Sequence, residues 1–253
     1  MNSPDEARRI INDWVSKQTD DKLQELIPSR DIINIFTRLV LTNTVYFSAE
    51  WEHKFLEPTY TKTQSFYLKD GAKVFVPMMH TDFQSFIYTR MGICQAVELP
   101  YQGDKFSMLI LVPDSGKFDE FEESIDILLI NRIIDEMEIN RVKLEMPRFS
   151  FESEFLLKTV LSEMGMAGAF YEDADFSGMA GNKDLFIEDV VHKAWISVDE
   201  EGTEATSASA VVVTTGIEEA VHITIDRPFL FLIRDGESGT IVFLGRVLNP
   251  LES

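Results

Sequence analysis

The sequence is short of cysteine, of basic residues and of membrane-length apolar runs. Cys94 is the only cysteine among 253 residues, so no disulfide can form within the chain and the compartment is left open, extracellular or cytoplasmic. The 23 basic residues are outnumbered by 43 acidic ones, and the formal net charge of −20 repels phosphate backbones and anionic membranes. No apolar run approaches the length of a membrane-spanning helix. We therefore expect neither a nucleic acid nor a membrane as a partner.

Catalytic motifs are equally absent from the sequence. It contains no G-x-S-x-G turn, no glycine-rich phosphate loop followed by Lys-Ser or Lys-Thr, no H-E-x-x-H and no cysteine–histidine metal spacing. The four histidines are scattered, and a close acidic pair such as Asp173 and Asp175 is expected from composition alone. We predict that the protein is not an enzyme and needs no cofactor or metal.

Predicted strands and helices are interleaved along the chain without an internal repeat. With 45% hydrophobic residues, the chain is long enough for one large domain with a sizeable core. Helical spacing predicts helices from residue 4 up to Pro28, at 118–137 as one or two helices, and at 154–164. Apolar runs predict strands at 36–47, 63–68, 73–77, 83–89, 93–100, 106–112, 141–151 and 185–198. This mixed order indicates an α+β domain with antiparallel or mixed sheets.

Three packing expectations accompany these elements. The first helix should bury one face, made of Ala7, Ile10, Ile11, Trp14 and Val15. The run at 36–47 is rich enough in β-branched and apolar residues to be buried on both faces of a sheet. Cys94 lies in an alternating stretch and should be a small hydrophobic residue of the core.

The stretch 200–217 is unusually rich in small and β-branched residues. Such a segment is too apolar for a flexible linker and too poor in large side chains to build a core. Because strand side chains alternate between two faces, one face would carry only small or β-branched residues, namely Thr203, Ala205, Ser207, Ser209 and Val211. We interpret the segment as a loop that can become a strand, although its composition is also typical of an ordinary exposed connection.

Several motifs in order resemble the serpins, the serine protease inhibitor superfamily. They lie at residues 11–15 (INDWV), 41–47 (LTNTVYF), 51 (W), 76–79 (VPMM), 191–194 (VHKA), 198–205 (VDEEGTEA), 223–233 (ITIDRPFLFLI) and 243–250 (FLGRVLNP). The resemblance implies one serpin-like domain over 1–253, with mixed β-sheets surrounded by helices and an exposed reactive-centre loop at about 200–221. A typical member begins well before the helix that contains Trp14. We therefore expect the usual amino-terminal helices and strands to be absent from this chain.

The resemblance implies a suicide-substrate inhibitor of serine proteases. The protease serine would attack a carbonyl of the loop and form an acyl-enzyme, after which the cleaved loop would insert as a strand of the central sheet. This requires an uncleaved fold that is metastable. The hinge that starts the insertion would comprise Glu200, Glu201, Gly202, Thr203, Glu204, Ala205, Thr206, Ser207 and Ala208.

The usual family spacing, counted from Gly202, places Gly216 before the scissile bond and Ile217 after it. A slip of one residue would instead place Thr215 or Ile217 before the bond. No Arg or Lys lies between Thr203 and Val221. We therefore expect targets with small or aliphatic primary specificity, elastase-like or subtilisin-like.

Four further positions match family residues that control opening of the sheet. Asn43 and His192 match a polar pair that bridges adjacent strands, and a buried hydrogen bond between them would be exchanged on insertion. Trp51 resembles the aromatic residue packed where the loop first enters. Arg148 is expected to pair with Glu200. For His192 and Trp51 the plainer interpretation is an ordinary core residue.

Two classes of function remain open at this point. One is an inhibitor, expected to be a monomer at risk of loop–sheet polymerisation, because an open sheet can accept the loop of another molecule. The other is a non-inhibitory or inactive truncated serpin that acts as a binding or structural protein. The small residues of the hinge favour the first class, and the expected absence of the amino-terminal part favours the second.

Overall fold

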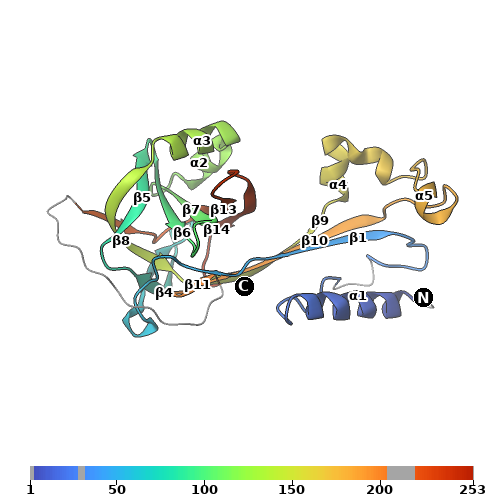
Figure 1. The fold of residues 1–253 in the computed structure, drawn as a ribbon, viewed down its shortest axis with the longest axis horizontal. Helices are drawn as coiled ribbons and strands as arrows, with labels where there is room; N and C mark the ends of the chain where they lie inside the picture. Colours follow the sequence, from blue (N-terminus) through green and yellow to red (C-terminus); the bar gives the residue numbers. More distant parts are fainter. Residues whose placement is uncertain (1–2, 28–31, 204–219, 253) are drawn as a thin grey trace. The chain divides into compact units, whose positions relative to one another are not determined.

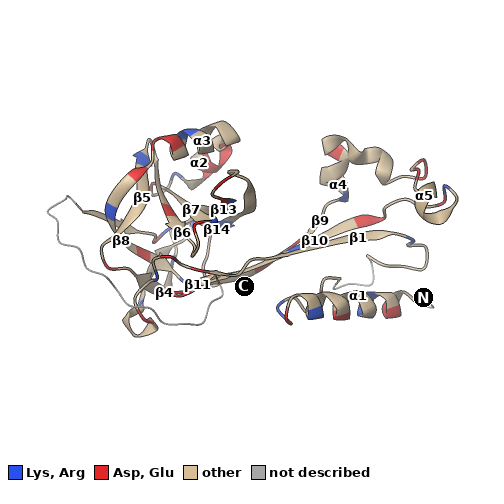
Figure 2. Cartoon of the chain, in the orientation of Figure 1, with Lys and Arg blue, Asp and Glu red and all other residues tan. Residues whose placement is uncertain are grey.

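The computed structural model describes residues 3–27, 32–203 and 220–252, which form two compact units (Figure 1). The first unit combines residues 1–47 with 151–196, and the second combines 48–150 with 197–253. Figure 2 shows acidic segments in both units. Within the described ranges, no helix is long and apolar enough to cross a membrane.

The first unit begins with helix α1 (Pro4–Gln18). The Ser3 side chain accepts a hydrogen bond from the Glu6 amide at 3.2 Å, and acidic residues fill the first turn, as expected of a helix start. The prediction that helical structure continues towards Pro28 is wrong. Asp20 and Asp21 adopt left-handed backbone angles, with φ of 48° and 62°, and these angles end the helix.

Packing of the first helix is narrower than its sequence pattern predicts. Val15 is buried, with Ala7 and Ile11 partly buried beside it, whereas Ile10 is 43% and Trp14 57% exposed. The cluster is completed by apolar residues from the segment after the helix and from the strands, namely Leu23, Leu26, Ile27, Ile33 and Val191. The residues beyond Gln18 therefore contribute to the core without being helical.

Two long strands of the first unit run parallel, β1 (Val40–Tyr46) and β10 (Asp189–Val198), and β9 (Phe149–Leu156) also pairs with β10. Alternation along β10 sends Val191 into the cluster around α1 and Val190 into a second cluster with Phe170 and Ile187. The strand predicted at 36–47 corresponds to β1, which begins only at Val40.

The prediction that this strand is buried on both faces is wrong. Residues 41–43 are exposed, because β1 has a single neighbour, β10, among the strands of the described residues.

The helix predicted at 154–164 starts later than expected. Strand β9 continues to Leu156, since phenylalanines alternate along 149–155, and helical structure begins with α4 (Lys158–Leu161) and the turns at 162–169. A short helix, α5 (Ser177–Ala180), follows.

The second unit contains a nine-stranded sheet, in the order β14-β13-β7-β6-β5-β8-β4-β3, with β12 paired to β8. The strands are β3 (Lys62–Tyr67), β4 (Lys73–His80), β5 (Gln84–Met91), β6 (Cys94–Pro100), β7 (Phe106–Pro113), β8 (Glu138–Pro147), β12 (Val221–Thr224), β13 (Phe229–Asp235) and β14 (Ile241–Val247). All pairs are antiparallel except β12 with β8. The strands expected at 63–68, 73–77, 83–89, 93–100 and 106–112 are confirmed within a few residues, whereas the single strand expected at 141–151 divides at Arg148 into β8 and β9.

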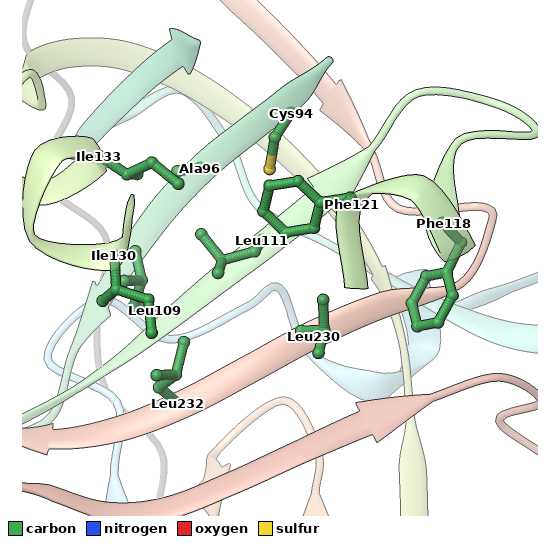
Figure 3. Packing of buried hydrophobic residues seen from close by; sticks show 10 residues of the cluster. All are labelled: Cys94, Ala96, Leu109, Leu111, Phe118, Phe121, Ile130, Ile133, Leu230 and Leu232. Atoms are coloured by element: carbon green, nitrogen blue, oxygen red, sulfur yellow. The ribbon is translucent and has the colours of Figure 1, made fainter. Parts of the chain in front are cut away.

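Helices α2 (Phe118–Ser124) and α3 (Ile127–Asp135) pack their apolar side chains on one face of this sheet (Figure 3). Cys94 lies in this cluster beside Phe121, as the sequence predicts, and is 2% exposed. Burial raises the pKa of its thiol to about 12. Cys94 is therefore a packed core residue of this unit.

Two very short strands complete the second unit. Strand β2 (Ala49–Glu50) pairs with β11 (Gly202–Thr203), and Thr203 also pairs with Val198 at the end of β10. A 3-10 turn at Pro58–Tyr60 precedes β3. Strand β11 therefore lies between β10 and β2, at the point where the chain enters the segment 204–219.

Candidate functional site

The chain reverses direction through three residues, Asp199, Glu200 and Glu201, between β10 and β11. The Asp199 amide donates to the Gly202 carbonyl at 3.0 Å, and the Asp199 carboxylate accepts from the amides of Glu201 at 2.9 Å and Gly202 at 3.3 Å. An aspartate that bonds the backbone two residues ahead is a common way to build such a turn. Burial nevertheless raises the pKa of Asp199, because desolvation outweighs these two hydrogen bonds.

Gly202 occupies a position that no larger residue fits. A Cβ atom built on it would lie 2.2 Å from the Ala49 carbonyl oxygen and 2.7 Å from the Glu50 Cα. The close approach of β2 therefore requires glycine here. The resemblance places Gly202 in the hinge, and the structure supplies the steric reason for that residue.

Thr203 is completely buried between two strands. It stands opposite Val198 on one side and Ala49 on the other. Its hydroxyl lies 2.7 Å from the hydroxyl of Tyr101. Thr203 is thus already paired as a strand residue, directly before the segment 204–219.

The expected ion pair between Arg148 and Glu200 is present. Arg148 donates from Nε and Nη2 to the two carboxylate oxygens at 2.7 and 2.6 Å, and the Thr61 hydroxyl donates to the same carboxylate. The side chain of Glu200 is only 2% exposed. This pair therefore differs from an exposed surface ion pair, because one of its charges is buried.

Glu201 has a partner that the sequence did not reveal. The Lys54 ammonium lies 2.7 Å from the Glu201 carboxylate and 2.9 Å from that of Glu50. Burial lowers the pKa of Lys54, but hydrogen bonds and attraction to Glu201 and Glu50 outweigh it and raise the pKa overall. The three consecutive acidic residues before Gly202 are thus each held by a different set of partners.

Trp51 contacts the same turn. It is fully buried, its indole N–H donates to the Asp199 carbonyl at 3.0 Å, and its backbone amide donates to the Glu201 carbonyl at 2.9 Å. Its ring stacks on Tyr101, with centroids 4.5 Å apart. Trp51 is therefore both a core residue and a contact of the loop base, which are the two interpretations that its sequence allowed.

Asn43 and His192 lie at the same register position on β1 and β10, as the resemblance implies. The buried hydrogen bond expected between them is not made within the described residues. Asn43 is exposed, because β1 has no second neighbour there, and His192 stacks on the Phe155 ring with centroids 6.2 Å apart. Their role in sheet opening remains a prediction.

Part of the predicted site lies outside the described residues. This holds for Glu204, Ala205, Thr206, Ser207, Ala208, Thr215, Gly216 and Ile217. Within 3–27, 32–203 and 220–252, no group of three or more histidine, cysteine, aspartate or glutamate side chains is arranged to hold a metal ion. The described part of the site is therefore the base of the loop.

Three residues of the loop base, Tyr101, Lys54 and Thr61, were not predicted from the sequence. Each meets its partner at the loop base across more than 100 positions of the chain, and none lies in a motif. The only local signal is that Tyr101 directly follows the predicted strand 93–100. A hydrogen-bonding aromatic residue is a frequent choice for a buried position with one polar partner.

Comparisons with known proteins agree on one family. A sequence model described as serpin (serine protease inhibitor) matches residues 1–250. A serpin-like protein of Thermococcus kodakarensis is 42% identical over 252 residues, covering 98% of this chain and 58% of its own length. The leukocyte elastase inhibitor of Sus scrofa is 37% identical, covering 99% of this chain and 68% of its own length.

A solved structure gives the same result for the fold. Serpin48, described as a highly specific serpin of the insect Tenebrio molitor, superposes with a TM-score of 0.86 at 33% identity, covering 97% of this chain and 65% of that one. The chain thus spans between about half and two thirds of the length of these relatives. From its family match, its relatives and its fold, the chain belongs to the serpin family.

Proposed function

We propose that this chain acts as a serine-type endopeptidase inhibitor of the suicide-substrate kind, with both units belonging to one serpin domain. The proposed steps are cleavage of the loop at 200–221, trapping of the acyl-enzyme and insertion of the loop as a new strand. One observation carries the proposal. The first loop residues, Gly202 and Thr203, already pair between β10 and β2.

Continuing that pairing predicts the register of the inserted loop. Thr203 stands opposite Val198 in an antiparallel pair. Each further pair of loop residues would then meet a position two residues earlier on β10. Ala205 would stand opposite Ile196, Ser207 opposite Ala194 and Ser209 opposite His192. The small residues that the sequence places on one face would thus occupy one continuous ladder.

Insertion in this register would separate β1 from β10. These strands are paired over Val40–Tyr46, with Asn43 opposite His192. The new strand would exchange that ladder for two ladders, one on each side, and would satisfy more backbone groups. Stabilisation of the cleaved form over the intact form is the thermodynamic consequence, and it would supply the force that distorts the trapped protease.

The proposed target is a serine protease with small or aliphatic primary specificity. The sequence near the proposed bond supports this, with Gly216 and Ile217 at the bond and no basic residue between Thr203 and Val221. A relative whose name describes an elastase inhibitor points in the same direction. The chain would supply the loop that the protease cleaves and that then inserts as a strand, with no catalytic residue, cofactor or metal of its own. It would act as a monomer prone to loop–sheet polymerisation.

Incubation with proteases of different specificity tests the proposal. Purified protein would be mixed with elastase, subtilisin, trypsin and chymotrypsin, and the products separated under denaturing conditions. We expect a covalent complex with elastase or subtilisin, and mass spectrometry of the released peptide should identify the bond at Gly216–Ile217 or one residue away. Cleavage without any complex, together with a cleaved form that melts at the same temperature as the intact form, would exclude the mechanism.

The second candidate is a non-inhibitory member that acts as a binding or structural protein. It is favoured by the exposure of residues 41–43 on β1, the strand that would accept the loop. Under this alternative the same protease mixtures yield nicked protein and no covalent band.

A further inference from the structure

Tyr101 is a buried residue that the proposed mechanism has not yet used. It is 1% exposed and follows directly after β6, where it forms an isolated antiparallel bridge with Trp51. Backbone hydrogen bonds fix the chain on both sides of it, from Glu52 to the Pro100 carbonyl at 2.9 Å and from Gln102 to the Glu50 carbonyl at 2.8 Å. Tyr101 is thus held rigidly against the segment that contains β2.

The ring and the hydroxyl of Tyr101 have separate partners. The ring lies nearly parallel to Trp51, with an interplanar angle of 11° and a centroid distance of 4.5 Å. The hydroxyl lies 2.7 Å from Oγ1 of Thr203, which is also fully buried. Burial raises the pKa of Tyr101, so the hydroxyl remains protonated and able to donate. A buried hydroxyl without a partner is costly, so each group stabilises the position of the other.

We propose that Tyr101 is the positioning residue that docks Thr203 into the sheet before any protease arrives. Its hydroxyl selects a hydrogen-bonding residue at the first position of the inserted strand and keeps that residue opposite Val198 and Ala49. The hydrogen bond between Tyr101 and Thr203 is observed in the structure. Its consequence for inhibition rests on the proposed function.

Docking of Thr203 makes insertion an extension of an existing strand. After acylation, the loop must insert before the acyl-enzyme is hydrolysed. If Thr203 is already paired, the next residues add to the ladder without first closing a long loop, and insertion avoids that entropic delay. Without the hydrogen bond, a larger share of the inhibitor should be released as cleaved product.

The contact is tested first without a protease, on the full chain. Tyr101→Phe and Thr203→Val each remove one hydroxyl with little change of volume, and the double variant removes both. The readout is hydrogen exchange of the Asp199 amide, which donates to the Gly202 carbonyl at 3.0 Å and therefore reports whether β11 is docked. Tyr88→Phe is the matched control, because its hydroxyl lies 3.3 Å from Gln95 in the same unit, away from the turn.

We expect roughly 3- to 10-fold faster exchange in each single variant, with the double variant no faster than the faster single one and the control unchanged. Effects that multiply in the double variant would show that the hydroxyls act independently, and would overturn the docking.

The second measurement is the number of inhibitor molecules consumed per molecule of elastase or subtilisin trapped. We expect this number to rise about 3-fold or more in both single variants and to stay unchanged in Tyr88→Phe. Coupled exchange with an unchanged number would overturn the positioning role. If neither the wild type nor any variant forms a complex, both the inhibitory function and the role of docking in inhibition are excluded. The hydrogen-exchange data then still show whether Tyr101 holds Thr203 in place.

Discussion

Arg148 and Glu200 form an ion pair in which the Glu200 side chain is 2% and the Arg148 side chain 38% exposed. Two hydrogen bonds of 2.7 and 2.6 Å join them, and the Glu200 carbonyl also accepts from the Phe55 amide at 3.1 Å. Together these contacts fix both the side chain and the backbone of Glu200, which lies within the turn that leads into the loop. Because the Glu200 side chain is buried, loss of Arg148 would leave a buried charge without its ion-pair partner.

Replacing Arg148 should destabilise the protein strongly. Arg148→Ala leaves the Glu200 carboxylate buried with Thr61 as its remaining side-chain partner, and we expect a loss of about 2–4 kcal/mol in the free energy of unfolding, measured in urea. Arg90→Ala is the control, since its pair with Asp114 is largely exposed and should be worth about 0–1 kcal/mol. Equal effects of the two substitutions would contradict the importance of burial.

Reversing the charge at Glu200 should promote self-association. Glu200→Lys places a like charge beside Arg148, so the turn should open and expose the sheet to the loop of another molecule. We expect more polymer after mild heating, measured by size-exclusion chromatography. Unchanged monomer stability and aggregation would count against this role of the pair.

Adding one methyl group at Gly202 should displace β11. In Gly202→Ala, the new Cβ would approach the Ala49 carbonyl oxygen to 2.2 Å, and we expect a destabilisation of about 1–3 kcal/mol in thermal or urea unfolding. Gly178→Ala provides the comparison, because nothing lies within 4 Å of its added Cβ. That substitution lies in a helix and should be neutral or stabilising by up to about 1 kcal/mol. A tolerated Gly202→Ala would show that β2 and β11 can move apart freely.

Removing the charge of Asp199 should not harm the fold. Because burial raises its pKa, the folded state holds the proton more tightly than the unfolded state, and ionisation costs stability once the pH is above the unfolded value. Asp199→Asn keeps the oxygen that accepts from Glu201 and Gly202, so its stability at neutral pH should equal or exceed that of wild type by up to about 1 kcal/mol. Asp199→Ala loses the acceptor and should be destabilised by about 1–2 kcal/mol. A strongly destabilised Asp199→Asn would mean that the negative charge itself is needed.

The buried thiol should make stability fall in alkali. The pKa of Cys94 rises from 9.0 to about 12 on folding, so the unfolded chain loses this proton first as pH increases. Stability should therefore decrease between about pH 9 and pH 12, by up to about 1.4 kcal/mol per pH unit from this group. Urea unfolding of wild type and Cys94→Ala across this range isolates the effect as a difference in slope. Identical slopes, or rapid reaction of native protein with a thiol reagent, would show that Cys94 is accessible.

Local patterns in the sequence were sufficient for much of the second unit. Alternating apolar residues predicted β6 and β7 and the core position of Cys94, because a strand that buries one or both faces needs such residues in series. The run at 118–137 predicted helices, and two are present. The hinge at Gly202 was placed by resemblance to a family, and its steric reason appeared only in the structure.

Predictions failed where the answer depended on distant neighbours. The strand at 36–47 has a buried composition, yet its exposure depends on which strands lie beside it, and β10 alone does so among the described residues. The first helix ends early because Asp20 and Asp21 take left-handed backbone angles. The spacing of Leu23 and Leu26 fits a continuing helix and gives no sign of this break.

The family, the α+β class, most strands and the small residues of the loop could be predicted without coordinates, because they depend on local patterns and ordered motifs. The folded molecule was needed to see that Tyr101 contacts Thr203, that Lys54 pairs with Glu201 and that Glu200 is buried. The first two of these contacts join residues separated by more than 100 positions, and Arg148, the ion-pair partner of Glu200, lies 52 positions before it. Their energies depend on burial and on atomic distances, which no local pattern in the sequence specifies.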